Sequence, residues 1–125
     1  MIEYVLKESD LLKAEHIPFY IVMNGGSDSF FPTEMKCLSQ GVGFGNDFGD
    51  CSFWEDLDEE EQKKYRRFDG ALFCTEVSNK KVILSNREIA YYMAIACEAY
   101  CKDYPETRNE IEGYIKSFIK LKGLK

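Results

Sequence analysis

The strongest constraint on the fold is a capped apolar helix in the second half of the chain. Residues 85–88 read Ser-Asn-Arg-Glu, an S-x-x-E capping box, and an apolar run follows directly. One face of the predicted helix carries six apolar residues: Ile89, Tyr92, Met93, Ala96, Cys97 and Tyr100. The opposite face is hardly polar before Glu98, and a helix that is apolar almost all round is a buried one. We therefore expect a sheet to pack against this helix.

Two strands are predicted before this helix and a second helix after it. Residues 68–77 and 81–84 are rich in aromatic and β-branched residues, and Ser78-Asn79-Lys80 between them is typical of a hairpin turn. Pro105-Glu106 begins a last helix with apolar residues at i, i+3, i+4, i+7 and i+8. Gly123 is the expected stop of that helix.

The first half of the chain gives weaker signals. A short helix capped at Ser9-Asp10 is compatible with residues 9–15, and residues 17–23 are compatible with a strand or with more helix. Phe31-Pro32 is expected to open another short helix, which Gly41 can end. These segments make the N-terminal part helical or mixed.

A glycine loop and an acidic segment follow. Residues 41–46 are expected to be a flexible loop, residues 51–54 a short strand, and residues 57–66 a helical turn or two. The order of elements predicts an α+β fold, with a small antiparallel sheet of about three to four strands packed against helices, two of them C-terminal. At 125 residues, the chain (1–125) is expected to be a single domain.

Charge is distributed very unevenly along the chain. Residues 47–61 contain eight carboxylates and no Lys or Arg. Residues 1–61 carry 14 acids against 3 bases, and residues 62–125 carry 8 acids against 13 bases, for a net charge of −6. This balance argues against sequence-independent nucleic-acid binding and against docking on an anionic membrane. It favours a positively charged protein partner.

Large aromatic rings lie among these carboxylates. Phe53 and Trp54 are costly to expose unless the core or a partner covers them. Aromatic anchors ringed by charge are typical of a protein–protein hot spot. The alternative for the run 58–61 is a solvated helix start with no further role. The predicted contact residues are Asp47, Asp50, Phe53, Trp54, Asp56, Asp58 and Glu59.

Catalytic and metal chemistry find little support in the sequence. His16 is the only histidine, so a histidine-based triad or a two-histidine metal site cannot be built, and packing explains it well. Asp47 and Asp50 do not follow the EF-hand pattern. The five cysteines include no CxxC pair and are expected to be free thiols in a reducing cytosol. We therefore predict no catalytic residue, no metal and no cofactor.

The sequence also favours a cytoplasmic location. Residues 1–4 are not followed by the basic and apolar regions of a signal peptide. The longest mostly apolar run, residues 89–97, is too short to span a bilayer. A soluble cytoplasmic protein is therefore expected.

Three segments carry a resemblance to a known family. Residues 41–50 read Gly-Val-Gly-Phe-Gly-Asn-Asp-Phe-Gly-Asp, and two further segments, 68–73 and 82–88, accompany them. Over residues 30–115 the chain resembles CdiI, the ribonuclease-toxin immunity proteins of bacterial contact-dependent growth inhibition systems. The resemblance implies a 1:1 complex with the C-terminal nuclease domain, of RNase or tRNase type, of a toxin delivered by a neighbouring cell. It implies protection of the producing cell and no catalytic residue.

Two other functions stay open on the sequence alone. One is a small acidic enzyme that uses paired carboxylates, or Cys51 as a nucleophile. It would require a concave pocket with an Asp, Glu or Cys of perturbed pKa. The other is a general acidic adaptor protein without a toxin partner.

Overall fold

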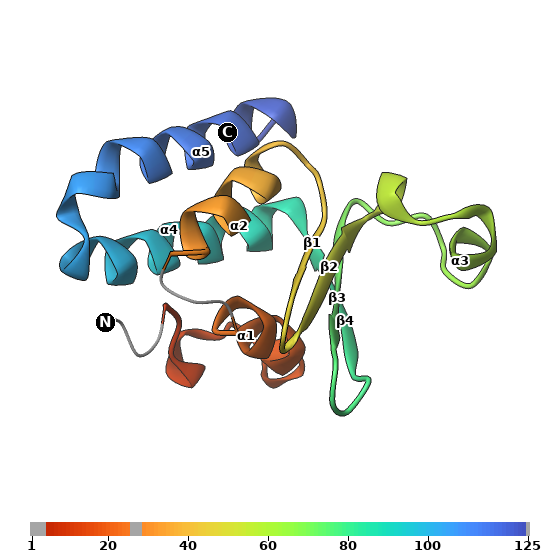
Figure 1. Ribbon diagram of the computed structural model, residues 1–125. Helices are drawn as coiled ribbons and strands as arrows, with labels where there is room; N and C mark the ends of the chain where they lie inside the picture. The colour runs from red at the N-terminus through yellow and green to blue at the C-terminus, as the bar shows by residue number, and fades with distance from the viewer. Residues whose placement is uncertain (1–4, 26–28, 125) are drawn as a thin grey trace.

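The computed structural model describes residues 5–25 and 29–124, so residues 1–4, where no signal peptide is predicted, lie outside it. The described residues form a four-stranded antiparallel sheet and five α-helices, which confirms the predicted α+β fold (Figure 1). The helices are α1 (Ile17–Met23), α2 (Phe31–Ser39), α3 (Glu59–Lys63), α4 (Asn86–Asp103) and α5 (Arg108–Leu121). The strands are β1 (Phe44–Asn46), β2 (Gly49–Phe53), β3 (Gly70–Thr75) and β4 (Lys81–Ser85). Short 3-10 turns are η1 (Glu8–Asp10), η2 (Ala14–His16), η3 (Trp54–Asp56) and η4 (Pro105–Thr107).

The sheet is a meander in the order β1-β2-β3-β4. Cys51 of β2 pairs with Phe73 of β3, and Phe73 pairs in turn with Val82 of β4. Because side chains alternate across a strand, these residues share one face of the sheet, which the helices cover. The neighbouring residues of each strand, including Asp50 and Lys81, occupy the other face.

Helix α4 forms where its capping box predicts. The Glu88 backbone N–H donates to Ser85 Oγ at 3.1 Å, and the Ser85 N–H donates to Glu88 Oε1 at 2.9 Å. All six apolar residues predicted on its main face are buried. The expectation that α4 is buried all round is wrong, because Tyr91 is 47% exposed and Ala94 is exposed. One side of α4 therefore faces solvent.

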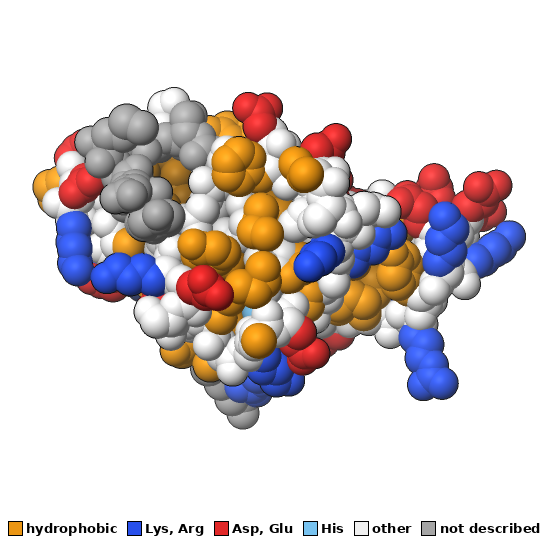
Figure 2. All heavy atoms as spheres, turned by 90° about the horizontal axis from the view of Figure 1, so that it is seen from below, with side chains coloured by type: hydrophobic (Ala, Val, Ile, Leu, Met, Phe, Trp, Pro, Cys, Tyr) orange, Lys and Arg blue, Asp and Glu red, His pale blue; other side chains and the backbone are white. Residues whose placement is uncertain are grey.

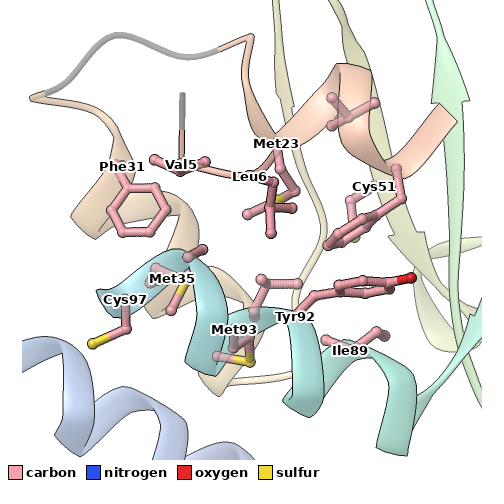
Figure 3. Close-up of a cluster of buried hydrophobic side chains, with 14 of the residues drawn as sticks. Val5, Leu6, Met23, Phe31, Met35, Cys51, Ile89, Tyr92, Met93 and Cys97 are labelled. Carbon is pink, nitrogen blue, oxygen red and sulfur yellow. The ribbon is translucent and has the colours of Figure 1, made fainter. Parts of the chain in front are cut away.

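Aromatic rings join the two layers. Phe19 of α1 stacks on Tyr92 of α4 with ring centroids 4.7 Å apart, and it meets Phe73 of β3 edge-on at 4.8 Å. Phe31 of α2 stacks on Tyr100 of α4 at 4.5 Å. Figure 3 shows α4 presenting its apolar side chains to the same cluster. Helix α5 packs on α2 and α4, and the left-handed Gly123 (φ 66°) follows its end as predicted.

The first half of the chain differs from expectation in two places. Residues 17–23 are helical, which decides between the two alternatives for that segment. The segment 41–46 is not a flexible loop throughout, because Phe44–Asn46 pairs with β2 as an edge strand. Gly41 has the positive φ (67°) that ends α2, whereas Gly43 is needed because a Cβ there would collide with the carbonyl oxygen of Cys51.

Within the described ranges 5–25 and 29–124, no helix is both long and apolar enough to cross a membrane.

The capping box gives a stability prediction. Substitution of Ser85 by Ala removes the side-chain acceptor of the Glu88 N–H, so we expect the free energy of unfolding to fall by about 1 kcal/mol. Urea denaturation measures this change. Ser117→Ala, at an exposed position inside α5, is the control and should be neutral or slightly stabilising. Equal losses in the two variants would contradict a specific role for the cap.

Candidate functional site

Residues 54–69, called the arm below, connect β2 to β3 and carry most of the predicted acidic segment. Figure 1 shows α3 in this arm, extended away from the helices that cover the sheet. Two carboxylates shape its backbone. Asp56 Oδ2 accepts the Phe53 N–H at 2.8 Å, and Asp58 Oδ1 accepts the Glu61 N–H at 2.8 Å as the N-cap of α3.

The arm has a small apolar centre of its own. Trp54 packs edge-on against Phe68 with ring centroids 5.3 Å apart, and Tyr65 packs edge-on against Phe68 with centroids 6.2 Å apart. Leu57 and Leu72 are buried although neither belongs to the main core cluster. Leu72 lies on the outer face of β3, so its side chain is covered on the side of the sheet away from the main core.

The structure distributes the five predicted acidic contact residues over three places. Asp47 is exposed in the turn between β1 and β2, and Asp50 is exposed on the outer face of β2. Glu59 is exposed in the first turn of α3. Asp56 and Asp58 are exposed too, but their carboxylates hold the backbone of the arm. The same capping-box pattern that predicts the start of the helix at residues 85–88 is present at residues 58–61 as D-x-x-E. It could have predicted the capping role of Asp58.

The two predicted aromatic contact residues differ in burial. Phe53 is fully buried, and its ring centroid lies 6.5 Å from that of Phe118. The core therefore covers Phe53, and it is not available as an anchor. Its place on the inner face follows from strand alternation with Cys51. Trp54 is half-buried, with the Arg67 guanidinium 5.6 Å from its ring centroid. It lines a hollow of about 260 Å³ together with Arg67, Phe68 and Lys122.

Three carboxylates from separate elements lie near enough to one another to interact electrostatically. They are Asp50 on β2, Glu61 on α3 and Glu76 after β3, called the acidic face below. Burial, then the negative charges of Glu76 and Glu61, raise the pKa of Asp50, while Lys81 opposes the shift. Lys81 is turned toward the arm, where its Nζ donates to the Tyr65 hydroxyl at 3.3 Å.

The sequence prediction did not include Glu61 and Glu76 among the contact residues. Glu76 lies outside the acidic segment and reaches Asp50 only because β2 pairs with β3. The arm as a whole carries seven acids and four bases. Figure 2 accordingly shows red and blue side chains together on the projection, and hydrophobic side chains between it and the body. The four bases therefore offset part of the negative charge of the arm.

One further carboxylate lies inside the fold. Glu34 of α2 is 1% exposed, and its Oε2 accepts a hydrogen bond from Asn46 Nδ2 at 2.8 Å. Its Oε1 has no hydrogen-bond partner among the described residues. Burial raises the pKa of Glu34 to about 7, against the opposing effect of the Asn46 hydrogen bond. This carboxyl is therefore readily held in its neutral form.

Nucleophilic chemistry at Cys51 has no support in this geometry. The thiol is 2% exposed, and burial, then the charge of Asp56, raise its pKa well above the ordinary value. All five cysteines are free, and Cys97 Sγ and Cys101 Sγ, 3.9 Å apart, form a weak hydrogen bond and no disulfide. The described part of the chain contains no group of three or more His, Cys, Asp or Glu that could hold a metal ion.

His16 packs in the interior as the sequence suggested. Its Nδ1 lies 2.8 Å from the Tyr92 hydroxyl, which also accepts the Leu12 N–H at 2.8 Å. Its Nε2 is 3.5 Å from Glu88 Oε2. The imidazole thus connects η2 to α4.

A family model described as CDI immunity protein matches residues 8–115. The match includes the segment 30–115 that carries the resemblance in the sequence and extends it toward the N-terminus. No curated protein matches the chain.

The buried Glu34 gives a pH-dependent prediction. Its pKa is raised from 4.5 to about 7 in the folded protein, so its stabilising effect is complete below pH 4.5 and is lost as the pH rises through 7. Between pH 5 and 8, the wild type should lose about 2 to 3 kcal/mol more unfolding free energy than Glu34→Gln. Urea denaturation across this range measures the difference.

Glu60→Gln, which changes an exposed carboxylate of α3, is the matched control and should retain the wild-type pH dependence. If Glu34→Gln retained the wild-type pH dependence as well, the raised pKa assigned to Glu34 would be refuted.

Proposed function

The chain belongs to the CDI immunity protein family, and we propose that it binds and neutralises a nuclease toxin domain of RNase or tRNase type. Family membership supports the toxin-neutralising role. The nuclease class follows from the resemblance to ribonuclease-toxin immunity proteins, and the acidic charge of the chain is compatible with a cationic partner of this kind. Binding alone would protect the cell, so the proposal assigns this protein no catalytic step. The protein would act in the bacterial cytoplasm, where its single domain would form a 1:1 complex.

The family match carries the toxin-neutralising role, and the interaction of three carboxylates at the acidic face supports a cationic partner. A nuclease binds a polyphosphate, so its active-site cleft is lined with cationic groups. Asp50, Glu61 and Glu76 offer negative charges from β2, from α3 and from the turn after β3. Such a surface complements a cationic cleft and accelerates encounter.

The arm extends this surface. Glu59 and Glu60 are exposed in the first turn of α3, and neither forms an ion pair with a base in the described part of the chain. The capping contacts of Asp58 keep that turn in place. We propose that these side chains meet the toxin beside the acidic face, whereas Asp56 and Asp58 act mainly through the shape of the arm.

The proposal is tested by co-expression with a nuclease toxin domain encoded beside this chain, the arrangement expected for an immunity protein. We expect the two proteins to co-purify at 1:1 stoichiometry, and we expect the purified chain to stop RNA cleavage by the toxin domain. The same assay with a non-cognate nuclease domain controls for general inhibition. A toxin domain that neither binds nor loses activity would reject the proposal.

Removal of charge tests where the toxin binds. Asp50→Asn/Glu59→Gln should slow association several-fold at low salt, because both carboxylates belong to the proposed surface. Stopped-flow or biosensor kinetics at two salt concentrations measure this rate. Asp103→Asn/Glu106→Gln removes the same charge near the end of α4, where both residues are exposed, and should leave the rate nearly unchanged. Equal slowing by the two variants would assign the effect to net charge instead of to this surface.

A further inference from the structure

Two turns lie side by side at one end of the sheet. Residues 47–48 connect β1 to β2, and residues 76–80 connect β3 to β4. The Glu76 N–H donates to the Phe48 carbonyl at 2.8 Å, so the β2–β3 pairing continues beyond the strands and brings the turns together. We call Phe48 and Val77 the turn pair.

The turn pair exposes apolar surface where polar residues are usual. Phe48 is 50% exposed and Val77 is 96% exposed. Single exposed apolar residues need no explanation, but here two of them are held in adjacent turns by a backbone hydrogen bond. Turn positions favour Gly, Asn, Asp, Pro and Ser, so turn preference does not account for either residue. The Phe48 side chain lies against Gly25 on one side, and the rest of it is exposed.

Both turns are held by their own hydrogen bonds. Asn46 Oδ1 accepts the Phe48 N–H at 2.9 Å, while Asn46 Nδ2 donates to the Val22 carbonyl and to Glu34. In the second turn, Thr75 Oγ1 accepts the Lys80 N–H at 2.9 Å and lies 2.9 Å from Ser78 Oγ. A side chain presented from such a scaffold loses little further entropy on binding.

The charges around the turn pair indicate its partner. Asp47 adjoins Phe48 in the first turn, Glu76 adjoins Val77 in the second, and all four residues are exposed. Asp50 follows on β2, so the turn pair borders the acidic face. Lys80 and Lys81 are the nearby bases, on the side of β4. Apolar side chains bordered by carboxylates fit an apolar recess with a cationic rim.

We propose that Phe48 and Val77 are the apolar anchor of the toxin complex and enter a recess beside the toxin's cationic cleft. The proposal rests on the proposed function and goes beyond it, because it assigns residues that slow dissociation. The acidic face then determines the rate of encounter and the turn pair the lifetime of the complex. This role replaces the one that the sequence assigned to the buried Phe53.

The test measures dissociation of the cognate toxin domain from Phe48→Ala and from Val77→Ser. We expect dissociation to be at least about tenfold faster for Phe48→Ala and several-fold faster for Val77→Ser, with association changed less than about twofold. Val77 is 96% exposed, so its substitution tests the anchor even if Phe48→Ala loses stability. Thermal unfolding of each variant reports that stability.

Matched controls are Val42→Ser and Leu121→Ser, whose side chains are 46% and 55% exposed outside the two turns. They should dissociate like the wild type. Wild-type binding combined with unchanged dissociation of both turn variants would overturn the anchor and leave the proposed function intact. Failure of the wild type to bind the toxin domain would reject both.

Discussion

Burial of one face of α4 is the constraint on which the rest of the structure depends. A four-stranded sheet with strands of three to six residues needs a covered apolar face to be stable. Tyr92 and Phe19 supply part of that cover, and Phe73 of the central strand β3 packs against it. Because the helices take one face of the sheet, the other face is left for the arm and for charged side chains. The candidate site is therefore a consequence of how α4 is buried.

Asn46 connects this core to the exposed turn. Its side chain joins the carboxyl group of Glu34, the C-terminal part of α1 and the Phe48 N–H. A buried ionised carboxylate with one unpaired oxygen is costly, whereas a neutral carboxyl is much less so. The raised pKa of Glu34 expresses this cost, because burial disfavours the ionised carboxylate. The conformation of the β1–β2 turn thus depends on a hydrogen-bond network that begins in the interior.

The sequence predicted those parts of the fold that local patterns determine. The capping box at residues 85–88 located the start of α4, and the period of the last helix identified its buried face. A different argument, from aromatic residues among carboxylates, placed Phe53 on a partner-binding surface. It was wrong because the sequence of the five-residue strand β2 does not show which of its faces meets the core. The acidic face could not be predicted from the sequence either. It depends on the pairing of β2 with β3, which brings Glu76 to Asp50 across 26 positions of sequence.

Charge and apolar contact contribute differently to a complex of the kind proposed. An ion pair between exposed side chains is worth about 0 to 1 kcal/mol, so carboxylates such as Glu59 can accelerate encounter without holding a partner for long. Buried aromatic or branched side chains contribute more, because they remove apolar surface from water. With Phe53 committed to the core, that contribution must come from other residues. Phe48 and Val77 are exposed, held in defined turns and adjacent to the carboxylates, so one end of the sheet combines both contributions.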